Sequence, residues 1–150
     1  DVYKRQGRHV SAAAVAAHEC GHAIQHATSY QWLQMRSQMV PMVSFSSKLM
    51  NIIMILGLIG AGVLKMFPFA TIILVFVILQ AVVTLFTIIT LPVEFDASRR
   101  ALIWLKSANI STPQEVNFAE DALKWAASTY VVAALAAAAY LLYYVALLKE

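Results

Sequence analysis

The sequence predicts an all-α fold: an integral membrane helical bundle of about three transmembrane helices, with a helix at its cytoplasmic face that carries an HExxH motif. Hydrophobic residues make up 61% of the chain and charged residues 13%, against roughly 45–50% and 25% in soluble proteins. Such a chain must use lipid as part of its solvent. Long uncharged runs recur, and no stretch alternates apolar and polar residues as a strand would.

The composition also limits the class of protein. The 150 residues are about one domain's worth of chain, so we expect a single membrane domain over residues 1–150. The net charge is +3, and basic residues form no stripe with aromatic residues, so no nucleic-acid partner is predicted. A single cysteine excludes an intrachain disulfide framework. Because the chain starts at Asp1, we expect a fragment whose upstream part is missing.

The first predicted helix covers residues 9–30 and contains a candidate metal site. His18 and His22 are four residues apart, so both lie on one helix face and can bind one metal ion. Glu19 projects to the side of that face, where it can accept a proton from water. This is the HExxH pattern of zinc metalloproteases, in which the Glu is the general base. Cys20 points to another side, and we interpret it as a small packing residue.

A catalytic zinc usually has a third protein ligand and one water. His26 repeats the four-residue spacing, but a straight helix rises about 12 Å between residues 18 and 26. That is too far for one ion with bonds of about 2 Å, so we do not expect His26 to be a ligand.

Three uncharged segments predict the membrane spans, at residues 49–64, 70–90 and 125–148. The first is shorter than the usual span of about 20 residues. Residues 31–48, which precede it, are amphipathic, and we expect an interfacial connection that is broken near Pro41.

The charge-dense segment 91–101 separates the second span from the third. It predicts a helix that runs to about Lys106, followed by a loop at residues 107–111. Thr112, Pro113 and Glu115 have the spacing of a capping box with Pro at the first helical position. The helix that starts there is expected to continue into the third span.

The distribution of positive charge predicts the orientation. Three spans place nine of the eleven Lys and Arg residues on the side that holds the HExxH helix, which identifies that side as cytoplasmic. Glu94 and Asp96 return to the same side at the end of a long span, where an ionisable group indicates function. Both acids are candidate third ligands on this argument.

Two segments carry a family resemblance. Residues 18–27 (HECGHAIQHA) and 91–101 (LPVEFDASRRA) resemble the YugP-type membrane zinc metallopeptidases of bacteria, and the likeness extends from about Val10 into the third span. It implies a zinc-dependent peptidase of the bacterial cytoplasmic membrane with a peptide or protein substrate. In the similar gluzincin peptidases a Glu on a later helix is the third ligand, which corresponds to Glu94. An Asp commonly lies four residues after that Glu; here the position is Ser98, so the acid is replaced or moved to Asp96.

The resulting hypothesis is a zinc-dependent membrane endopeptidase with His18, His22 and Glu94 as Zn²⁺ ligands and Glu19 as the catalytic base. Two alternatives stay open: a non-catalytic membrane scaffold that binds metal, and a site-2-type intramembrane protease. The second needs a metal-binding Asp within a later span, and the first two predicted spans contain no acid. Three further side chains are weaker candidates for orienting ligands or stabilising an oxyanion, namely Asp96, His26 and Arg99. The oligomeric state is left open.

Overall fold

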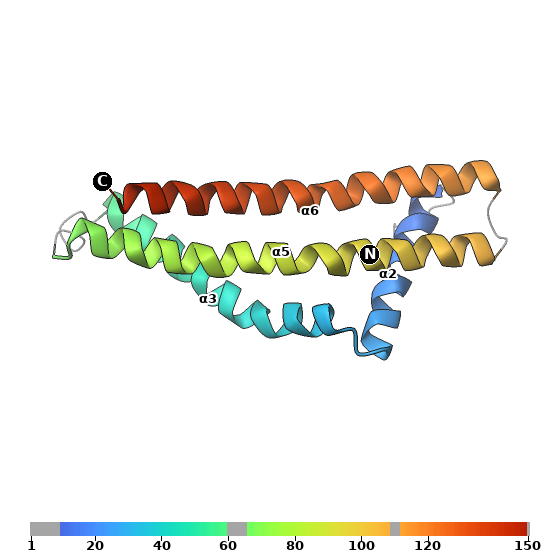
Figure 1. Cartoon of the computed structure of the whole chain (residues 1–150), viewed down its shortest axis with the longest axis horizontal. Coiled ribbons are helices and arrows are strands. Elements are labelled where there is room, and N and C mark those ends of the chain that lie inside the picture. Colours follow the sequence, from blue (N-terminus) through green and yellow to red (C-terminus); the bar gives the residue numbers. More distant parts are fainter. Residues whose placement is uncertain (1–9, 60–65, 109–111, 150) are drawn as a thin grey trace. The chain divides into compact units, whose positions relative to one another are not determined.

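The structure is a computed structural model, and it describes residues 10–59, 66–108 and 112–149. In these three ranges the chain forms four helices and no strand (Figure 1). The helices are α2 (Val10–Ala27), α3 (Gln31–Ile59), α5 (Phe69–Ser107) and α6 (Pro113–Leu147). The predicted all-α class is confirmed.

The helices divide between two compact units. The first comprises Asp1–Gln34 and Thr90–Val132, and the second comprises Met35–Ile89 and Ala133–Glu150. Helix α2 and the charge-dense end of α5 both belong to the first unit, together with the start of α6. A single domain over residues 1–150 stays a prediction.

Three helices, α3, α5 and α6, are long and apolar enough to cross a membrane. Their large apolar side chains are widely exposed; Leu58 is 83% exposed and Ile59 is 84% exposed. Contiguous apolar surface of this kind is unfavourable in water and favourable against lipid tails. The sequence predicted about three membrane spans, and three helices of the described residues are suitable for that role, which confirms the prediction. Residues 60–64 of the first predicted span lie outside the described residues.

Helix α2 ends three residues earlier than predicted. The amide of Tyr30 donates to the carbonyl of Gln25 (2.9 Å) and the amide of Ser29 donates to that of His26 (3.2 Å). Ser29 has a φ of 52°, so this is a Schellman cap in which a left-handed residue closes the helix. The expected end at residue 30 was therefore wrong, and His9 lies outside the described residues.

The expected break near Pro41 was also wrong, because Pro41 lies inside a continuous α3. Proline removes one backbone donor from a helix. In lipid, however, unwinding the helix would leave several more backbone groups without partners. Continuing the helix through Pro41 leaves fewer polar groups unpaired than breaking it.

Helix α5 joins the second predicted span and the charge-dense segment in one rod, with Pro92 inside it. Helix α6 begins with the predicted capping box: the Glu115 amide donates to Oγ1 of Thr112 (3.3 Å), and the Thr112 amide donates to the Glu115 carboxylate (2.7 Å). It then runs without interruption through the third predicted span. Residues 109–111 of the predicted loop lie outside the described residues.

In the second unit, α5 and α6 are joined by polar side chains. Nε2 of Gln80 and Oγ1 of Thr84 both donate to the carbonyl oxygen of Ala137, each at 3.1 Å. The rings of Phe76 and Tyr144 pack with centroids 5.3 Å apart. Such interhelical hydrogen bonds satisfy groups that lipid cannot satisfy.

The core of the first unit is built from small residues. Its buried cluster combines two residues from each helix, namely Ala14 and Ala17 of α2, Ala101 and Leu105 of α5, and Ala119 and Leu123 of α6. Alanines in these positions let helix backbones approach closely. The alanine-rich sequence of α2 therefore serves to bring its HExxH face against α5.

Candidate metal centre

Helix α2 approaches α5 very closely at Gly21, inside the HExxH motif. A Cβ atom at Gly21 would lie 2.5 Å from the carbonyl oxygen of Ala97, closer than any real side chain allows. Gly21 is thus the residue that lets the two helices meet at this level. Because His18 and His22 flank Gly21 on α2, and Glu94 lies one turn before Ala97 on α5, this contact places all three side chains together.

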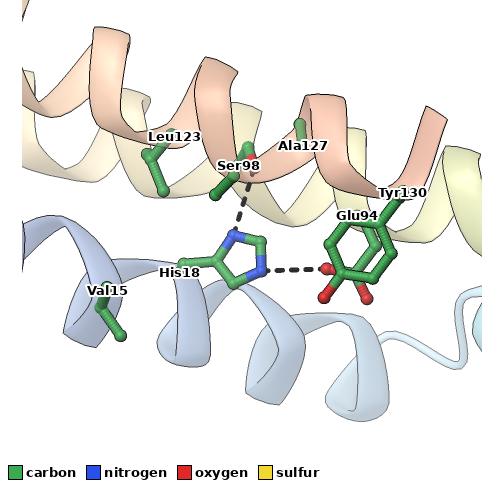
Figure 2. Close-up of a pocket in the computed structure, with 8 residues that line it drawn as sticks. Val15, His18, Glu94, Ser98, Leu123, Ala127 and Tyr130 are labelled. Carbon is green, nitrogen blue, oxygen red and sulfur yellow. Dashed lines mark hydrogen bonds and ion pairs between the residues drawn. The ribbon is translucent and has the colours of Figure 1, made fainter. Parts of the chain in front are cut away.

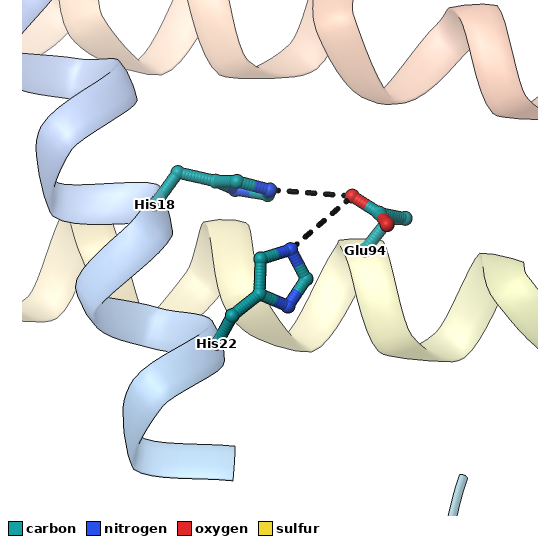
Figure 3. A group of neighbouring side chains, drawn as sticks. All are labelled: His18, His22 and Glu94. Carbon is teal, nitrogen blue, oxygen red and sulfur yellow. Dashed lines mark hydrogen bonds and ion pairs between the residues drawn. The ribbon is translucent and has the colours of Figure 1, made fainter. Parts of the chain in front are cut away.

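His18, His22 and Glu94 converge on one point (Figure 3). Oε2 of Glu94 lies 3.2 Å from Nε2 of His18 and 3.6 Å from Nε2 of His22. The two imidazole rings stand edge to face, with centroids 4.7 Å apart and an interplanar angle of 88°. The carboxylate of Glu94 is buried, at 3% exposure, while both rings are partly open to solvent.

The donor set fits zinc. Ligand atoms about 2.0–2.1 Å from a tetrahedral zinc ion lie about 3.3 Å from one another. The two Nε2–Oε2 distances, 3.2 and 3.6 Å, bracket that value. Two imidazoles and one carboxylate also match the His₂Glu set of catalytic zinc sites, which keep a fourth position for water.

Gln25 supports His22 from inside the protein. Its side chain is fully buried, and its Nε2 donates to the carbonyl oxygen of Val93 (2.8 Å) and to Oδ2 of Asp96 (3.0 Å). Both partners are acceptors, so this end of the amide must be the nitrogen. The other end, Oε1, lies 3.0 Å from Nδ1 of His22.

This arrangement assigns the proton on His22. An amide oxygen only accepts hydrogen bonds, so Nδ1 of His22 must donate. In the neutral ring Nε2 then carries a lone pair, and that lone pair faces the Glu94 carboxylate. Two electron-rich atoms facing each other require a positive charge, either a proton or a metal cation. Accordingly, the hydrogen bond to Glu94 raises the pKa of His22 above its usual value.

Asp96, a weaker candidate in the sequence, belongs to this supporting network. Its Oδ1 accepts from Arg99 (3.1 Å) and its Oδ2 from Nε of Arg100 (2.6 Å), while Oδ2 also accepts from Gln25. The guanidinium of Arg100 in turn lies 5.9 Å from the centre of the Tyr30 ring. The two arginines thus fix the Asp96 carboxylate, which in turn fixes the amide of Gln25. Asp96 reaches His22 only through Gln25.

Ser98 contacts the other histidine. Its Oγ lies 3.2 Å from Nδ1 of His18 (Figure 2), so it supports the ring nitrogen that points away from Glu94. Hydrogen bonds of this kind orient metal-binding histidines. In this chain a hydroxyl at position 98 and an amide at position 25 provide them.

The remaining predicted residues lie around the centre. Glu19 is exposed beside His18, and its charge contributes to the raised pKa of His22. His26 is exposed and is not part of the convergent group found in the described residues.

Cys20 is an exposed free thiol, so its interpretation as a packing residue was wrong. The buried face of α2 carries Ala14, Ala17, Gly21 and Gln25, at spacings of three and four residues. Cys20 follows Ala17 by three residues, but the buried residue at this level is Gly21, which follows Ala17 by four and lies against Ala97 of α5.

Sequence reasoning missed Gln25. Its signal was local: a long polar amide three residues after His22, in a helix otherwise rich in alanine. A buried amide requires hydrogen-bond partners, and Gln25 lies on the buried helix face. Its partners, however, are 68 and 71 residues away along the chain, and no local pattern points to them.

These features define a membrane-helix protein with a His, His and Glu cluster in which the carboxylate is buried and the two rings are partly exposed. The family model described as "Putative neutral zinc metallopeptidase" matches residues 1–149, so the chain belongs to this family, and the family implies zinc. The chain is 40% identical over 136 residues to "Putative membrane protease YugP" of Bacillus subtilis (strain 168), a match that covers 86% of the chain and 54% of the relative. The chain thus spans about half the length of that relative. No solved structure matches it.

Proposed function

We propose that this chain carries the metal centre of a zinc-dependent, membrane-bound endopeptidase that hydrolyses peptide or protein substrates. The observation that carries the proposal is the convergence of His18, His22 and Glu94, with Glu19 exposed beside them. Membership of a zinc metallopeptidase family supports the same reading.

His18, His22 and Glu94 would hold the ion through two Nε2 atoms and a carboxylate oxygen. Zinc bound there would supply a Lewis acid that polarises the scissile carbonyl and lowers the pKa of a coordinated water. Two buried side chains determine which ring nitrogen is available to the ion, because Gln25 contacts Nδ1 of His22 and Ser98 contacts Nδ1 of His18. Both Nε2 atoms are thereby directed to the same point.

Glu19 would act as the proton carrier. It follows His18 directly, so it stays within reach of the centre while its side chain is exposed. A solvent-accessible carboxylate can accept a proton from the attacking water and then deliver it to the leaving amine. The two partly open histidine rings leave a solvent-facing side from which substrate can approach.

The proposed location is a bacterial cytoplasmic membrane, with the lipid bilayer around α3, α5 and α6 and the active site on the cytoplasmic face. Arg99 and Arg100 lie at the metal-centre end of α5, as the excess of basic residues on cytoplasmic segments would require. The three apolar helices and the membrane protease named among its relatives support a membrane protein.

The test compares the wild-type chain with Glu19→Gln in detergent, measuring zinc by elemental analysis and cleavage of casein and of a peptide library. We expect both proteins to bind one zinc, and the variant to lose at least about 100-fold in cleavage rate, the contribution typical of a general base. Asp121→Asn, which neutralises an exposed acid of α6, is the matched control and should cleave as the wild type does.

The outcomes separate the candidate functions. Equal cleavage by Glu19→Gln and wild type would contradict the role of Glu19. Zinc binding without cleavage by the wild type would instead favour the alternative of a non-catalytic metal-binding scaffold.

A further inference from the structure

An apolar pocket adjoins the candidate metal centre within the first unit. It has a volume of about 120 Å³ and is lined by residues of α2, α5 and α6 (Figure 2). Val15, Leu123 and Ala127 form part of its apolar wall, and His18, Glu94 and Ser98 provide polar groups on another side, with Tyr130 also lining it. The pocket therefore shares two of its lining residues with the proposed zinc site.

The pocket lies on one particular side of the centre. His18 and Glu94 line it, whereas His22 does not. A peptide whose scissile carbonyl lies at the point where the three ligands converge would have one flanking side chain on the His18 side. That side chain is the part of a substrate nearest to the pocket.

The residues that line the pocket determine which kind of chemical group it can bind. An empty apolar cavity is unfavourable because the atoms on its walls lack partners across the gap. An apolar group that fills it recovers those contacts, whereas a charged group would find polar partners only on the side of His18, Glu94 and Ser98 and would lose its hydration against the apolar wall. In size, an apolar cavity of about 150 Å³ binds benzene, so 120 Å³ suits a branched aliphatic side chain.

We propose that this pocket receives the aliphatic side chain of the substrate residue next to the scissile bond. The proposal rests on the peptidase function proposed above and adds the substrate class: peptides with a residue of the size of Val, Leu or Ile at that position. Ala127 lines the pocket with only a methyl group, so a longer side chain at this position would fill part of the space.

The test measures binding, so it does not depend on turnover. Acetohydroxamate and isovalerohydroxamate both offer a zinc-binding group, but only the second carries an isobutyl group. Each buried CH₂ contributes about fourfold to affinity. For the zinc-loaded wild type we expect isovalerohydroxamate to bind at least about tenfold more tightly than acetohydroxamate.

Two variants alter the pocket in opposite directions. Ala127→Leu should abolish the advantage of the isobutyl group and leave acetohydroxamate affinity unchanged. Leu123→Ala should shift the preference toward the larger phenylacetohydroxamate. The matched control, Ala136→Leu, adds the same side chain at an exposed position of α6 and should behave as the wild type.

The pocket assignment would be overturned if isovalerohydroxamate exceeded acetohydroxamate in affinity by the same factor in the wild type and in Ala127→Leu. It would also be overturned if the two compounds bound the wild type equally. Failure of the peptidase function has a different signature, namely the expected hydroxamate pattern together with no cleavage of any peptide. If peptides are cleaved, the library should show the aliphatic preference in the wild type and a preference for Gly or Ala in Ala127→Leu.

Discussion

Nδ1 of His22 lies 3.0 Å from Oε1 of the fully buried Gln25, and this pair determines which nitrogen of His22 faces Glu94. The amide cannot reverse without placing its oxygen against the carbonyl of Val93 and the carboxylate of Asp96. The orientation of a candidate zinc ligand is thus set by contacts that Gln25 makes with another helix.

We expect Gln25→Met to weaken zinc binding by about 10–100-fold, the usual effect of removing a hydrogen bond that orients a metal-binding histidine. Competition with a chelator measures the affinity, and ¹⁵N NMR of the His22 ring should change from one tautomer to a mixture. Gln31→Met, at the exposed start of α3, is the control and should match the wild type.

Gln25→Glu keeps an acceptor for His22 but places a second carboxylate beside Asp96. Combining it with Asp96→Asn restores a donor between these two side chains, so the double variant should recover part of the lost affinity. A single His22 tautomer and wild-type affinity in Gln25→Met would show that Gln25 does not position the ligand.

Glu94→Ala should remove most of the bound zinc, since only His18 and His22 would remain as protein ligands. Elemental analysis of the purified chain checks this. His26→Ala removes an exposed imidazole outside the cluster and should keep full occupancy. Full occupancy in Glu94→Ala would instead assign the third ligand to another group, with Asp96 and His26 as the first to examine.

Gly21→Ala should destabilise the protein by about 1–3 kcal/mol, the usual cost of overpacking. The added methyl group would meet the carbonyl oxygen of Ala97 at 2.5 Å, and backbone cannot yield as a flexible side chain can. Denaturant unfolding in detergent measures the change. Gly57→Ala, at an exposed position of α3, should be neutral or slightly stabilising because alanine favours helices.

The parts of the fold that depend on residues close together along the chain could be predicted from the sequence. Uncharged runs indicated the three apolar helices, and the Thr112–Glu115 capping box indicated the start of α6. Pro41 was misread because its effect depends on the surroundings: a proline that ends a helix in water can be retained in a long apolar helix. The early end of α2 depends on Ser29 adopting a left-handed conformation, which serine seldom does.

Some residues of the candidate site could likewise be predicted from the sequence, and others could not. His18, Glu19 and His22 are recognisable because their spacing is local. The proposed role of Glu94 as third ligand followed from the family resemblance and agrees with the predicted topology. Gln25 was missed because its meaning lies in bonds to residues about 70 positions away. Cys20 was misjudged because helical spacing alone leaves open which face of α2 meets α5.

The exposure of Cys20 also gives the chain a built-in reporter of membrane sidedness. It is the one cysteine in the sequence, and it lies between the two histidines on the solvent-accessible side of α2. A membrane-impermeant maleimide should leave Cys20 unmodified in intact cells and modify it after permeabilisation, with Cys20→Ser as the blank. Labelling of intact cells would place the HExxH helix outside. This thiol can therefore locate the candidate metal centre without any introduced tag.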